Sequence, residues 1–94
     1  MLLATADKAN SLFRVVEVGG RRPTQLTDFI GADTVIIVVD GEPQRLIGMG
    51  GMTAGGMEFE QHDPAGTDQP IVQVWVIIED GDGKFWVERA GSSI

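Results

Sequence analysis

The chain of 94 residues has no cysteine, a single histidine and no long hydrophobic run. Without cysteine, disulfides, thiolate metal sites and thiol catalysis are excluded. A histidine-based zinc site would need carboxylates as its other ligands, because His62 stands alone. The longest apolar run, residues 35–39, is far below the ~20 residues of a membrane-spanning helix. The N-terminal apolar stretch is too short for a signal peptide, so we expect a cytoplasmic protein.

Basic residues are also scarce, and residues 46–83 contain none. The net charge is −7 and the isoelectric point is about 4.4. Such a surface repels phosphate backbones and anionic lipid, so we expect no binding to nucleic acid or to a membrane. The acidic residues of the 46–83 segment are Glu58, Glu60, Asp63, Asp68, Glu79, Asp80 and Asp82. They indicate either a solvated face that aids solubility or a surface that meets a basic partner.

The motifs that bind cofactors and metals fail when their spacing is checked. A dinucleotide loop beginning at Gly48 would need its third glycine where Thr53 stands. A calcium loop beginning at Asp80 would need glycine where Phe85 stands. His62 precedes Asp63 in a segment rich in turn formers and has no nucleophile nearby in sequence, so we interpret it as a solvated loop residue. We therefore predict no cofactor, no metal and no catalytic residue.

What the sequence does contain is a series of β-strand patterns separated by turn signals. Strands are predicted at 12–18, 34–39, 44–47, 57–61, 70–78 and 85–89. Turns are predicted at 40–43 and 79–84, a surface loop at 62–69 and a frayed tail at 90–94. Residues 5–11 fit one helical turn or a lead into the first strand. Residues 24–30 are the best helix candidate, with Thr24 as N-cap and Gly31 after the end.

The strand pattern at 70–78 is apolar on both faces. One face carries Val72, Val74, Val76 and Ile78, and the other carries Ile71, Gln73, Trp75 and Ile77. Because side chains alternate along a strand, both faces should be covered. The strand is therefore central in the sheet, or a second subunit covers one of its sides.

Residues 48–57 form the most unusual segment, with five glycines and three methionines between strand patterns. Glycine gives backbone freedom and close approach, and methionine gives adaptable apolar surface. A flexible connector or a glycine-kinked strand pair would explain the composition. We also consider a mobile loop that contacts a ligand or partner.

The expected fold is a single domain spanning residues 1–94, of the α+β class and mostly antiparallel β. It would have five or six strands in hairpins and one short helix, and a small, partly open β-barrel is the alternative.

The leading functional hypothesis is a non-enzymatic protein-interaction module that self-associates or binds a basic partner protein. Composition alone suggests an inhibitor, an immunity-like factor or a phage or mobile-element component. The alternative is a small-molecule binding protein, with the Gly/Met segment as a lid over an aromatic pocket for a cationic or amphipathic ligand. The residues predicted to bind are Met49, Met52, Met57, Glu58, Glu60, Trp75 and Trp86.

Overall fold

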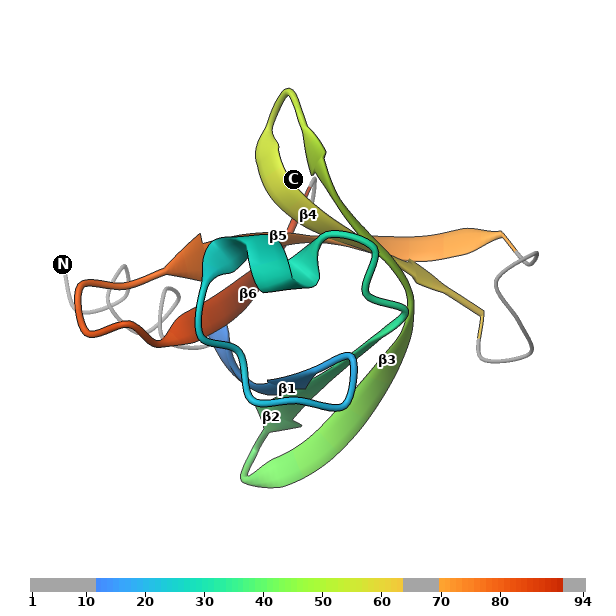
Figure 1. The fold of residues 1–94 in the computed structure, drawn as a ribbon. Helices are drawn as coiled ribbons and strands as arrows, with labels where there is room; N and C mark the ends of the chain where they lie inside the picture. Colours follow the sequence, from blue (N-terminus) through green and yellow to red (C-terminus); the bar gives the residue numbers. More distant parts are fainter. Residues whose placement is uncertain (1–11, 64–69, 91–94) are drawn as a thin grey trace, which may run out of the picture.

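The computed structural model describes residues 12–63 and 70–90, which form six antiparallel strands closed into a barrel (Figure 1). Each strand pairs with the next in sequence, and the last pairs back to the first. The strands are β1 (Leu12–Val18), β2 (Thr34–Val39), β3 (Glu42–Thr53), β4 (Gly56–His62), β5 (Ile71–Glu79) and β6 (Phe85–Arg89). The one helical element is a 3-10 turn, η1 (Leu26–Phe29). The prediction of mostly antiparallel β is confirmed, and the barrel alternative describes the fold better than an α+β sheet does.

The predicted helix at 24–30 is a single 3-10 turn, and this is why the α+β prediction is not confirmed. The Asp28 carboxylate accepts hydrogen bonds from the backbone N–H groups of Thr24 and Gln25, 2.9 and 3.1 Å away. Gly31 follows at a φ of +76°, a conformation that ends the turn. The four residues serve to place Phe29, whose side chain is fully buried, over one end of the barrel.

The barrel interior is filled by side chains from every strand. Phe29 contacts Phe85 with ring centroids 5.5 Å apart. Phe13, which is partly buried against the core, packs on Trp75 in a T-shaped arrangement with ring centroids 5.9 Å apart. Small barrels of this kind leave room only for their own side chains. The buried core residues are Val15, Val18, Phe29, Ala32, Val35, Ile37, Leu46, Met57, Phe59, Trp75, Ile77, Phe85 and Val87.

The Gly/Met segment is strand, and the hypothesis of a mobile loop is wrong. Residues 48–53 continue β3, 56 and 57 begin β4, and only Ala54 and Gly55 form the turn. The tip of this hairpin projects beyond the rest of the barrel (Figure 1). The interpretation as a glycine-kinked strand pair agrees with this arrangement.

The glycines of β3 allow another part of the chain to approach the strand closely. The N–H of Gly50 donates to the Ala32 carbonyl at 2.9 Å, and the Gly50 carbonyl accepts from the N–H of Gly31 at 2.8 Å. The N–H of Gly48 donates to the Asp33 carbonyl at 3.0 Å. A Cβ on Gly50 would overlap the Phe29 carbonyl oxygen. Glycine therefore provides close approach here rather than mobility.

Smaller corrections concern the ends of elements. The turn predicted at 40–43 is the two-residue turn Asp40–Gly41, since Glu42 and Pro43 already pair with β2. His62, predicted to begin a loop, pairs with Ile71 as the last residue of β4. The helical turn considered at 5–11, the rest of the loop over 62–69 and most of the tail over 90–94 lie outside the described residues. In the described part of the chain, no helix is long and apolar enough to cross a membrane.

Candidate functional site

Three of the predicted binding residues, Met49, Glu58 and Glu60, meet on the outer face of the β3–β4 hairpin. Met49 pairs directly with Glu60, and Glu58 lies opposite Gly51 on the same face. Met52, near the tip, borders their shallow hollow of about 120 Å³, but it pairs with Met57, so its side chain lies on the other face of the hairpin. The exposed fractions of Met49 and Met52 are 47% and 60%. The outer face of the hairpin therefore brings one exposed methionine, Met49, together with two carboxylates.

Met57 is not part of this outer surface. Its side chain is 2% exposed and packs in the barrel core. The sequence placed it with the other two methionines because all three lie in the same Gly-rich segment. The turn at Ala54 and Gly55 fixes the register of the hairpin, and that register turns Met57 inward.

The outer face of β5 extends the hairpin surface with an apolar row. Trp75 and Ile77 point into the core, so the alternate side chains of β5 point outward. These side chains are Val74, Val76 and Ile78, and Val72 precedes them at the bulge where the β4–β5 register shifts. Val72 is 55% exposed, and the other three are half-buried.

Carboxylates flank this row on both sides. Glu60 lies opposite Val74, and Glu58 lies opposite Val76. On the other side, Glu88 of β6 lies opposite Val76. The acidic–apolar surface is defined here as Met49, Glu58, Glu60, Val72, Val74, Val76, Ile78 and Glu88. Val72, Val74, Val76, Ile78 and Glu88 were not among the predicted binding residues. The sequence pattern of residues 70–78 did, however, predict that both faces of this strand are apolar.

The two tryptophans point in opposite directions. Trp75 is 4% exposed, and its indole N–H donates to Gln61 Oε1 at 2.9 Å. The Arg89 guanidinium lies 5.0 Å from its ring centroid. Trp86 is half-buried on the outside of the barrel, where it pairs with Ile78. Neither tryptophan lines the hollow beside Met49, Glu58 and Glu60.

Asp80 organises the turn between β5 and β6. Its Oδ1 accepts from the N–H groups of Asp82 and Lys84, at 2.8 and 2.9 Å, and its Oδ2 accepts from the Trp86 indole N–H at 2.9 Å. The Trp86 hydrogen bond, followed by that of Lys84, lowers the pKa of Asp80. The Asp-Gly-Asp-Gly-Lys stretch therefore builds a hairpin turn, as the sequence predicted.

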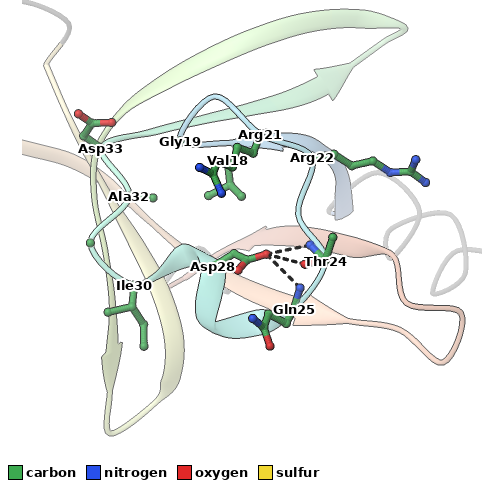
Figure 2. Close-up of a pocket in the computed structure, with 11 residues that line it drawn as sticks. Val18, Gly19, Arg21, Arg22, Thr24, Gln25, Asp28, Ile30, Ala32 and Asp33 are labelled. Atoms are coloured by element: carbon green, nitrogen blue, oxygen red, sulfur yellow. Dashed lines mark hydrogen bonds between the residues drawn. The ribbon is translucent and has the colours of Figure 1, made fainter.

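A polar hollow of about 630 Å³ lies between the connection after β1 and the segment after η1 (Figure 2). Asp28 lies at its centre and accepts from Thr24 N, Thr24 Oγ1 and Gln25 N. The backbone N–H of Thr24 contributes most to lowering the pKa of this carboxylate. Arg21, Arg22 and Asp33 line the rim. All three donors meet Asp28 Oδ2, so this carboxylate holds the start of the η1 turn in place.

Among residues 12–63 and 70–90, no group of three or more acidic or histidine side chains is placed to hold a metal ion. Neither a protein-family model, nor a curated protein, nor a solved structure matches this chain.

Proposed function

We propose that this protein is a non-enzymatic interaction module whose acidic–apolar surface binds a basic, amphipathic segment of a partner protein. The observation that carries the proposal is the outer face of β5. Its inner face already supplies Trp75 and Ile77 to a filled core, yet its outer face is also aliphatic. An antiparallel strand with one solvated face normally carries polar residues there. An apolar outer row indicates a surface that becomes covered.

Exposure and charge indicate what kind of partner would fit. Val72 and Met49 are each about half exposed, so covering each of them would contribute about 1 kcal/mol. Glu58, Glu60 and Glu88 flank the apolar row and would attract Lys or Arg side chains. Such rim charges contribute more to specificity and association rate than to affinity. A strand or helix with alternating aliphatic and basic residues matches both properties.

Self-association through this surface alone is less favourable. A second copy facing the same surface would bring both sets of Glu58, Glu60 and Glu88 into one interface, which would then hold six carboxylates and no basic residue of the surface. Like charges brought together at an interface oppose binding. Native mass spectrometry should therefore give mainly monomer when the protein is alone. A dimer that is lost in a Val74→Glu variant would favour the self-associating form of the proposal instead.

The lid hypothesis gains no support from the observed geometry, since residues 48–53 and 56–57 lie in hydrogen-bonded strands. The inhibitor, immunity-like and phage or mobile-element settings stay predictions from composition.

Calorimetric titration with a synthetic peptide of alternating lysine and leucine tests the proposal. We expect the Glu58→Gln/Glu60→Gln double variant to bind the peptide about 3- to 10-fold more weakly at low salt. The Asp40→Asn/Glu42→Gln double variant is the matched control, because it also removes two exposed acids, at the far end of β3 and in the turn before it. Equal weakening in the control variant would show that only net charge matters and would contradict the proposed site.

A further inference from the structure

A cleft elsewhere on the barrel is basic, in contrast to the acidic–apolar surface. A cleft of about 330 Å³ lies between β1, the connection after it and the β5–β6 turn. Arg14, Arg22 and Lys84 line this cleft, with Asp82 as its only acid among the described residues. The whole chain has 14 acidic residues and 7 Lys or Arg, so this 3-to-1 basic excess reverses the overall composition. The fold has gathered scarce positive charge from three separate parts of the sequence.

Arg14 has an unsatisfied donor at this cleft. It lies on the outside of β1 between Val38 and Trp86, with its guanidinium carbon 5.9 Å from the Trp86 ring centroid. Its Nε is buried and has no hydrogen-bond partner among the described residues. A buried donor without an acceptor is unfavourable, and more so in a charged group. Because Nε is enclosed, a ligand in the cleft would meet the terminal nitrogens of this guanidinium rather than Nε.

The nearby carboxylates do not neutralise the two arginines. Asp80 uses both of its oxygens on the donors of its own turn, and its charge faces Lys84. Asp28 is held by Thr24 and Gln25, and Arg22 extends away from it (Figure 2). Within the described ranges, neither Arg14 nor Arg22 has an ion pair with a carboxylate. Both guanidinium groups are therefore available for an external anion.

We propose that this cleft binds an oxyanion, either a carboxylate or a phosphate group, through Arg14 and Arg22, with Lys84 adding positive charge. Guanidinium groups match the paired oxygens of both anions. Val16, which is 41% exposed, and Pro23 form an apolar wall beside the basic groups. The ligand would then be a small organic anion whose apolar part contacts this wall. The site is separate from the acidic–apolar surface and does not depend on the function proposed for it.

Nuclear magnetic resonance titration tests the proposal, with inorganic phosphate and benzoate as probes at constant ionic strength. We expect saturable shifts of the Arg14 Nε–H signal and of the Val16 and Lys84 amides, with a Kd of about 1 mM or tighter. Saturation by phosphate alone assigns a phosphate-bearing ligand. Saturation by benzoate alone assigns a carboxylate with an apolar body.

Substitutions separate a specific site from general charge attraction. Arg14→Gln and Arg22→Gln should each weaken probe binding by about ten-fold or more, which is the loss of one charge-assisted hydrogen bond. Arg45→Gln, an exposed arginine on β3 outside the cleft, should leave the affinity unchanged. Arg22 lies in an exposed connection, so its variant keeps the test valid if Arg14→Gln fails to fold. No saturable shift with either probe, or equal weakening by Arg45→Gln, would overturn the proposal.

Discussion

Replacing Gly50 with alanine tests the role assigned to the glycines of β3. The added Cβ would overlap the carbonyl oxygen of Phe29, which belongs to the backbone and cannot rotate away. To make room, the segment from Phe29 to Ala32 must move away from β3. That movement breaks the hydrogen bonds that Gly50 makes with Gly31 and Ala32.

The magnitude follows from what the movement disrupts. Two backbone hydrogen bonds contribute about 1 kcal/mol each. Phe29 is fully buried, and complete loss of such a side chain costs about 3–5 kcal/mol, which a partial shift would not reach. We therefore expect Gly50→Ala to lower the free energy of unfolding by about 2–4 kcal/mol. A small domain has only about 5–15 kcal/mol in total, so this loss is large.

Gly51→Ala is the matched control one residue along the same strand. A Cβ there meets no heavy atom within 4 Å. Alanine also restricts the unfolded chain, so the variant should be neutral or up to about 1 kcal/mol more stable. Urea unfolding followed by circular dichroism measures both variants. Equal midpoints for Gly50→Ala and Gly51→Ala would refute the close-approach explanation and restore the flexible-connector interpretation.

Three further predictions follow from side-chain placement. Met57→Ala should lower the free energy of unfolding by about 2–4 kcal/mol and Met52→Ala by less than about 0.5, as measured by urea unfolding; the reverse order would contradict the observed register. Asp80 has a lowered pKa in the folded state, so it contributes stability above the ordinary carboxyl pKa that is lost as pH falls through the lowered value. The stability difference between the wild type and Asp80→Asn should accordingly shrink between about pH 5 and pH 2, and a constant difference would show that the carboxylate charge is unimportant. Acrylamide should quench Trp86 more than Trp75, so Trp86→Phe should remove most of the quenchable fluorescence, whereas unchanged quenching would place Trp75 at the surface.

The strands could be predicted from sequence, because alternation and turn residues are local signals. β5 and the turn after it match the prediction closely, and so does β1. Closure of the barrel could not be predicted, since it depends on pairing such as Leu12 with Glu88 across almost the whole chain. The length of the helix was overestimated because the spacing of Leu26, Phe29 and Ile30 fits both an α-helix and a 3-10 turn.

The glycines of residues 48–57 illustrate why part of the candidate site was placed incorrectly. A glycine in a sequence does not reveal whether its flexible backbone or its lack of a side chain is needed. Only the close approach of residues 31–33 to β3 shows that the lack of a side chain is needed here. Whether a side chain points into the barrel or away from it also depends on how the sheet closes. Alternation separates Trp75 from Val74 and Val76, but only the closed barrel determines which set points inward. Met49, Glu58 and Glu60 lie on one face of the hairpin, and whether they bind a partner stays a prediction.

Mapping the alternating lysine–leucine peptide onto the protein by amide chemical shifts is the most direct test of the proposed interaction surface. The proposal predicts that the largest shifts fall on Glu58, Glu60, Val74, Val76 and Glu88, and that they disappear in a Val74→Glu/Val76→Glu variant that remains folded. Shifts spread evenly over all acidic residues, or centred away from β4 and β5, would contradict it.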